Sequence, residues 1–140
     1  MPTLPWIATP AAAGAAGSLP DEVLVLGSRL LLRRARDIPR FITAAQAIRR
    51  QVMAADGALG LSLRAEPFAK TFWTLSAWRD EDALDSFVEA LPHERTMRDF
   101  HLRLRDPVFV TWTVPRNALP VAWSDAVSRI AGTCTPVILN

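Results

Sequence analysis

The chain has 140 residues, of which half are apolar and 21% are charged, so it is long enough for one domain and too apolar to be disordered. Its formal net charge is only +2, although fifteen of the sixteen basic residues are arginines, and so small an excess supplies little of the counterion release that nucleic-acid binding needs. The single cysteine, Cys134, allows no internal disulfide. The sequence shows no secretory leader and no apolar run of the ~18 residues that span a bilayer. We therefore expect a cytoplasmic protein that does not contact membranes.

The first part of the chain predicts an arm, a strand and a helix, in that order. Residues 1–20 contain four prolines and an Ala/Gly run, so we expect an irregular arm that Trp6 anchors on the body or on a neighbouring subunit. Residues 23–33 alternate between two apolar sets, which predicts a strand. Asp37 then precedes a run of apolar residues at helical spacing that ends at Gly57, and Pro39 stands in its first turn, where a missing N–H does no harm.

Two strands and a second helix follow. Residues 59–63 place leucine at alternate positions, and residues 71–78 read Thr-Phe-Trp-Thr-Leu-Ser-Ala-Trp, a strand that is apolar on both faces. Asp80 is the expected N-cap of the next helix, since two acids follow it at the positive end of the helix dipole. Pro92 interrupts that helix, and a further turn or two runs through His93.

The last strand is predicted over residues 108–114 and is again apolar on both faces, and Ser124 is the expected cap of a short C-terminal helix. The order β-α-β-β-α-β predicts an α+β, ferredoxin-like sandwich with a four-stranded antiparallel sheet and two main helices on one face. We divide the chain into an arm over 1–20, this domain over 21–116, and a C-terminal extension with a short helix over 117–140.

The second face of such a sheet would carry a row of Leu, Trp and Val side chains. An apolar patch of that size is rarely left in water. The simplest cover is a second copy of the same sheet, so we predict a homodimer that packs sheet to sheet.

Two segments carry a resemblance to a known family. They are residues 57–63, Gly-Ala-Leu-Gly-Leu-Ser-Leu, and residues 72–84, which end a strand in Trp78 and open a helix at Asp80, with His93 following near the helix end. This pattern resembles the dimeric α/β barrel superfamily, nearest to its antibiotic-biosynthesis-monooxygenase-like proteins, which include small actinobacterial members. The resemblance covers residues 23–114.

The resemblance implies a small monooxygenase-like enzyme of secondary metabolism that uses no metal or flavin and acts on an apolar, aromatic, polyketide-type small molecule. In such oxygenases the substrate's own carbanion or phenolate reduces O₂, so the protein needs only to desolvate and orient it. We expect one apolar pocket between the sheet and the helices. Its candidate catalytic residues are His93 as base or hydrogen-bond donor and Arg98 as anion partner. Its candidate substrate-binding residues are Trp73, Trp112, Ser28 and Met97.

Each of these residues also has a structural interpretation. His93 can face solvent or bond a backbone carbonyl, Arg98 can pair with Glu94, and Met97 can belong to the core. Trp73 and Trp112 can simply fill the dimer interface. The chain would then be a non-catalytic ligand-binding or dimerisation module.

Haem binding through His93 is a third interpretation. The haem-degrading relatives pair that histidine with a Trp about a helix length earlier and with an Asn on the first strand. Here Ala83 stands ten residues before His93 and residues 21–33 contain no Asn. The haem-binding set is therefore incomplete in this sequence.

Overall fold

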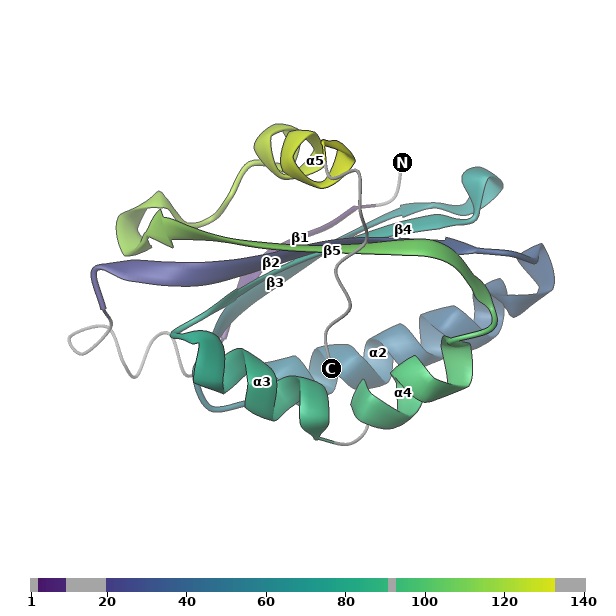
Figure 1. Cartoon of the computed structure of the whole chain (residues 1–140), viewed down its shortest axis with the longest axis horizontal. Helices are drawn as coiled ribbons and strands as arrows, with labels where there is room; N and C mark the ends of the chain where they lie inside the picture. Colours follow the sequence, from purple (N-terminus) through teal and green to yellow (C-terminus); the bar gives the residue numbers. More distant parts are fainter. Residues whose placement is uncertain (1–2, 10–19, 91–92, 133–140) are drawn as a thin grey trace.

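The computed structural model describes residues 3–9, 20–90 and 93–132. Figure 1 shows a sheet with helices α2 (Ile38–Ala54), α3 (Glu81–Glu89) and α4 (His93–Phe100) against one face, and α5 (Trp123–Ala131) against the other. None of the helices in the described ranges is long and apolar enough to cross a membrane.

The described strands form one antiparallel sheet in the order β1-β3-β4-β2-β5. The strands are β1 (Thr3–Ala8), β2 (Glu22–Leu32), β3 (Ala58–Glu66), β4 (Thr71–Trp78) and β5 (Leu104–Pro115), and the short 3-10 turns are η1 (Ala35–Asp37), η2 (Pro67–Ala69) and η3 (Arg116–Ala118). Strands β2 to β5, with α2 after β2 and α3–α4 after β4, reproduce the predicted βαββαβ order. The ferredoxin-like α+β class is therefore confirmed, with a fifth strand added at one edge.

Aromatic and aliphatic side chains fill the space between the sheet and helices α2, α3 and α4. Trp78 is completely buried and its ring centroid lies 4.8 Å from that of Phe87 on α3. At the other end of the layer, Phe41 on α2 lies 4.5 Å from Phe72 and 5.5 Å from Phe100 between ring centroids. Two apolar clusters in this layer therefore tie all three helices to one face of the sheet.

Helix α3 begins as the sequence predicts. The Asp80 carboxylate accepts a hydrogen bond of 2.8 Å from the backbone N–H of Ala83, which satisfies one of the free donors of the first turn. This bond lowers the pKa of Asp80 below its ordinary value of 3.8, because it favours the ionised carboxyl.

We expect Asp80→Ala to reduce the free energy of unfolding by about 0.5–2 kcal/mol at pH 7, measured by urea denaturation. Since the folded-state pKa is lowered, this contribution is present above pH 3.8 and is lost as the pH falls through the folded-state value. Asp80→Asn, which keeps the side-chain acceptor, is the control and should lose less at pH 7 than Asp80→Ala. A loss of the same size in both variants would contradict the capping role.

The N-terminal arm is not irregular over residues 3–8, and the prediction is wrong there. These residues form β1, which pairs antiparallel with β3. Pro5 sits where the register shifts between Leu4 and Ile7, and an edge strand tolerates proline at such a bulge. Trp6 anchors the strand as expected, since a Cβ added to Gly60 of β3 would lie only 2.4 Å from its indole ring.

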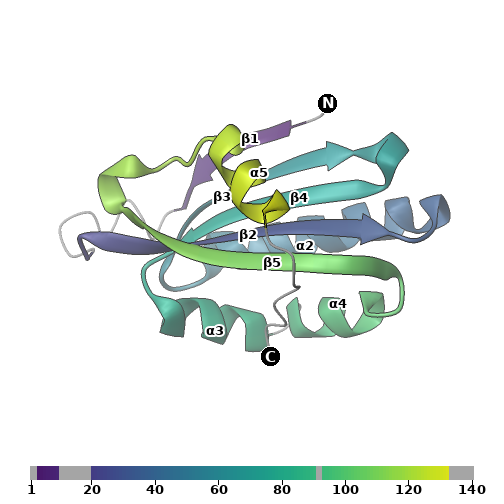
Figure 2. The same cartoon turned by 45° about the horizontal axis from the view of Figure 1, so that its top comes forward.

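The second face of the sheet is not bare, because α5 lies on it (Figures 1 and 2). Ala126 and Ile130 of α5 are fully buried, and Trp112 and Trp123 pack against the same apolar cluster. The helix begins at Trp123 with Ala122 at the N-cap, so Ser124 lies inside it and does not cap it. Part of the apolar face that was assigned to a second copy is therefore covered by this chain.

Asp37 stands at the N-cap of α2 as predicted, with Pro39 in the first turn, but its side chain makes no capping bond. Instead the buried Asp37 carboxylate pairs with Arg103 at 2.7 Å. Arg103 directly precedes β5, so this ion pair holds the start of β5 beside the start of α2. The predicted helix break at Pro92 and the lone Cys134 lie outside the described residues.

Candidate functional site

His93, the first residue of α4, lies half-buried between α2 and α3. Its backbone N–H donates to Gln51 Oε1 of α2 at 2.9 Å, and its ring Nδ1 lies 3.2 Å from the Val88 carbonyl oxygen. The imidazole also packs on Phe87, with 4.7 Å between ring centroids. A neutral ring that donates from Nδ1 to Val88 keeps a free lone pair on Nε2, which can accept a proton.

Burial lowers the pKa of His93 below its ordinary value of 6.5, because desolvation disfavours the charged ring; the bond to the Val88 carbonyl acts in the opposite direction. The ring is therefore neutral at pH 7. A neutral imidazole of fixed tautomer is the form that a general base requires.

This shift gives a pH prediction for stability. As the pH falls below 6.5, the unfolded chain takes up the proton before the folded chain does, so stability falls until the pH reaches the folded-state pKa. We expect His93→Gln, which cannot titrate, to lose less stability than the wild type between pH 7.5 and pH 5 in urea denaturation. Equal losses in the two proteins would contradict the buried, neutral state of His93.

An open groove of about 420 Å³ runs between the C-terminal end of α2 and α3, and His93 is not among the residues that line it. Its lining includes Gln51 and Phe87, the two residues that contact His93. Alanines make up much of the remaining wall, and charged residues stand at its margin. The other lining residues are Ala54, Ala55, Asp56, Arg79, Asp82, Ala83, Ser86 and Ala90. The volume falls in the range of small-molecule sites.

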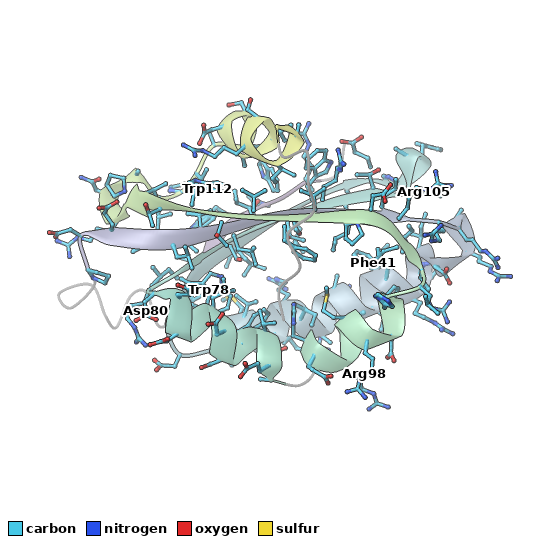
Figure 3. The ribbon with its side chains drawn as sticks, in the orientation of Figure 1. Phe41, Trp78, Asp80, Arg98, Arg105 and Trp112 are labelled. Atoms are coloured by element: carbon cyan, nitrogen blue, oxygen red, sulfur yellow. The ribbon has the colours of Figure 1, made fainter. Side chains whose placement is uncertain are left out.

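The two tryptophans that were predicted to share a pocket with His93 lie on the opposite side of the sheet. Trp73 pairs in register with Arg29, and Trp112 pairs with Val25, a residue of the cluster under α5. Figure 3 shows Trp112 on the α5 side of the sheet, while Trp78 lies on the helix side. The structure therefore does not bring Trp73 or Trp112 to His93.

The remaining candidates occupy structural positions. Arg98 is exposed, pairs with Glu94 one helical turn earlier and points away from the sheet (Figure 3). Met97 is half-buried one turn after His93. Ser28 is buried and its hydroxyl is hydrogen-bonded to that of Thr74 on β4, so it faces the packed interior and no ligand.

A haem does not fit this arrangement. Nε2 of His93 could serve as an axial ligand, since Nδ1 is bonded to a carbonyl in the usual way. The space between sheet and helices, however, is filled by the two apolar clusters, and the His93 ring lies against Phe87. In the described ranges no three His, Cys, Asp or Glu side chains gather as a metal ion would require.

Two parts of the site were missed from the sequence. Gln51 reads as an ordinary polar residue of a helix, yet it bonds both the His93 N–H and, through Nε2, the Phe87 carbonyl at 3.1 Å. In the sequence, Gln51 is recognisable only as a polar residue at the edge of the apolar stripe of its helix. Many surface helices have such a residue, so its role could not be predicted. Arg29 was counted within a strand, although its guanidinium carbon lies 6.0 Å from the Trp73 ring centroid.

The sheet order and the helix layer define a ferredoxin-like α+β fold, and solved structures share it. SnoaB of Streptomyces nogalater, described as a cofactor-independent oxygenase, superposes with a TM-score of 0.57 at 15% identity over 72% of this chain and 99% of its own. Rv0793 of Mycobacterium tuberculosis superposes with a TM-score of 0.59 at 14% identity, over 64% of this chain and 92% of its own. A conserved protein of Methanosarcina mazei gives 0.59 at 11% identity, over 66% and 92%.

The chain itself belongs to the DUF3291 family, a domain of unknown function whose family model matches residues 33–133. The match begins just after β2 and extends through α5, so it covers residues 33–116 of the domain over 21–116. None of the curated proteins matches this sequence.

Proposed function

We propose that this protein is a small monooxygenase-like enzyme that acts without a cofactor on an aromatic, polyketide-type molecule of cytoplasmic secondary metabolism. The observation that carries the proposal is the neutral His93, with its tautomer set by the Val88 carbonyl, in contact with Gln51 and Phe87, which line a groove of about 420 Å³. The likeness to SnoaB, which is described as a cofactor-independent oxygenase, supports the same reaction class.

The groove offers a mixed surface to such a substrate. Phe87 and the alanines of α2 and α3 present apolar area to an aromatic ring system, and Gln51 and Arg79 present donors to its oxygens. His93 would remove a proton from the substrate, and the resulting carbanion would pass one electron to O₂. The substrate radical and superoxide recombine to a peroxide anion at the carbon that lost the proton, a CH₂ carbon of the substrate, and His93 returns the proton to give a hydroperoxide. The hydroperoxide loses water to leave a carbonyl, so one oxygen atom stays in the product and the other leaves as water with the two hydrogens of that CH₂ group.

Oxygen uptake with a panel of anthrones and hydroquinones tests this proposal. We expect His93→Gln to lower kcat by about 100-fold or more with little change in KM, since general bases contribute factors of that order. His101→Gln, an exposed histidine beyond α4, is the matched control and should keep wild-type rates. An Arg98→Gln variant that keeps full activity would remove the predicted anion role of Arg98, and a His93→Gln variant that keeps it would end the proposal.

A non-catalytic ligand-binding module is the second candidate. The two apolar clusters packed between the sheet and the helices favour it, because they occupy the layer in which a reaction of this kind would be shielded from water. The two functions separate in one assay: the binding module would bind panel members in calorimetry while taking up no oxygen with any of them.

The homodimer stays a prediction. It depends on an uncovered apolar face, and α5 covers the portion of that face around Val25 and Ala77. Only the part beyond α5 is left for a second copy to cover.

A further inference from the structure

The stretch of the second face beyond α5 carries a short row of charged and aromatic side chains. Arg29 of β2, Trp73 of β4 and Arg64 of β3 are directly opposite one another across three adjacent strands. One row away, towards α5, the corresponding positions are Gly27 and Leu75, and a Cβ on Gly27 would already touch Ile130 of α5. The row therefore begins where the cover of α5 ends.

Trp73 is held in place by contacts on two sides. Its indole Nε1 donates to Glu66 Oε1 at 3.0 Å, and the Arg29 guanidinium carbon lies 6.0 Å from its ring centroid. Arg64 flanks Trp73 from the other strand, and paired residues in a sheet have Cβ atoms about 4.5–5.5 Å apart. All three side chains are half-buried, so they form a partly desolvated surface of fixed order.

The charge on this surface is not balanced. Within the described part of the chain, neither Arg29 nor Arg64 has a carboxylate within 4.0 Å. Arg105 stands opposite Leu31 in the next row, near the end of β5 far from α5 (Figure 3), and it too has no such partner. Glu66 is engaged with the indole. Two half-buried guanidinium groups thus flank one aromatic ring with one acid beside it, and a third, that of Arg105, lies one row further along and two strands away.

We propose that this row, Arg29–Trp73–Arg64, is a binding site for a planar aromatic carboxylate or phenolate. The indole face gives stacking area to a flat ring, and a guanidinium is a planar fork that binds a carboxylate through two hydrogen bonds. A neutral aromatic would lose the charged bonds, and an aliphatic acid would lose the stacking. The site lies across the sheet from His93, so it does not rest on the proposed oxygenase activity.

A second copy of this chain fits the row less well than a small anion does. A two-fold, face-to-face contact centred on this row would bring Arg29 and Arg64 of the two copies close together, and each copy would add only a glutamate that is already bonded to Trp73. Like charges brought together across an interface disfavour association. Charge complementarity therefore favours an anionic ligand over self-association at this place.

Calorimetric titration of the full chain with 2-naphthoate and with the neutral 2-naphthamide tests the site. We expect 2-naphthoate to bind at least tenfold more tightly than 2-naphthamide, and Arg64→Gln and Arg29→Gln each to weaken naphthoate binding about tenfold or more, the loss of a hydrogen bond to a charged group. Both variants should leave the weaker binding of naphthamide unchanged. Arg34→Gln is the matched control, because Arg34 is an exposed arginine of the β2–α2 connection.

Three results would overturn the proposal. The first is an equal affinity for 2-naphthoate and 2-naphthamide. The second is a loss of naphthoate affinity in Arg34→Gln as large as that in Arg64→Gln. The third is a concentration-dependent doubling of mass in sedimentation that Arg64→Gln abolishes, in a protein that does not bind naphthoate. The last would assign the row to a second copy. His93→Gln should bind naphthoate as the wild type does; a loss in that variant would place the ligand at the His93 groove instead.

Discussion

Replacing Trp78 with alanine is expected to cost about 3–5 kcal/mol of the free energy of unfolding, the largest effect of any single substitution considered for this chain. The Trp78 side chain is completely buried and packs on Phe87, and its Nε1 donates to Ser76 Oγ at 2.9 Å. Truncation leaves a cavity at the centre of the cluster that joins α2, α3 and the sheet, and it orphans a hydroxyl. The total free energy of unfolding of a domain of this size is only about 5–15 kcal/mol. The midpoint of urea denaturation should therefore fall by a large amount.

Trp78→Phe is the control, because it refills most of the cavity and should recover a good part of the loss. Trp123→Ala provides a comparison on the other face of the sheet. Trp123 is only half-buried, so its replacement should reduce the free energy of unfolding by less than that of Trp78. A loss of less than about 1 kcal/mol in Trp78→Ala would show that this side chain is not the centre of the helix-side core.

Replacing Ile130 with alanine is expected to cost about 2–5 kcal/mol and to loosen α5 from the sheet. Ile130 is fully buried, and its Cδ1 is within 2.9 Å of where a Cβ on Gly27 would stand. Loosening α5 uncovers Val25, Leu75 and Ala77, so the variant should bind a hydrophobic dye such as anilinonaphthalene sulfonate more strongly than the wild type. Urea denaturation and dye fluorescence measure the two effects.

Two further variants isolate the contact between α5 and the sheet. Ser128→Ala, an exposed change on the same helix, should stay within about 0.5 kcal/mol of the wild type. Gly27→Ala disturbs the same contact from the sheet side, because the added methyl would meet Ile130 and Trp112 at 2.9 and 3.1 Å. If both Ile130→Ala and Gly27→Ala left stability and dye binding unchanged, α5 would not be seated on this face.

The periodic parts of the sequence predicted the fold well. The alternation in residues 71–78 correctly predicted a strand that is apolar on both faces, and the Asp80 cap was confirmed by its bond to Ala83. The prediction failed where the signal was weak or contradictory. Residues 3–8 form a strand although Pro5 argues against one, because an edge strand needs no donor on its free side.

The position of α5 could not be read from its own residues. Its buried stripe contains Ala126 and Ile130, which indicate an apolar side but not the surface that receives it. The pairing that does identify this surface is the close fit of Ile130 against Gly27, a contact between residues about a hundred positions apart. Sequence periodicity holds no information on such a contact, and so a face that belongs to α5 was assigned to a second subunit.

The candidate site was predicted by residue type more than by arrangement. His93 was singled out because imidazole suits proton transfer, and the structure gives it a fixed tautomer beside a groove. Arg98 was chosen as anion partner because it lies close to His93 in sequence, but an exposed helix position allowed it to pair with Glu94. The arginines nearest to Trp73 are Arg29 and Arg64, which only strand register brings together.

The pairing of β1 also bears on how the chain acquires its shape during synthesis. Thr3 is synthesised some 60 residues before its partner Arg64. At roughly 5–20 residues per second, the ribosome takes about 3–12 s to make that interval. Throughout it the indole of Trp6 has no Gly60 to rest on, so the nascent chain carries an unsheltered aromatic segment that chaperones could engage before the sheet is complete.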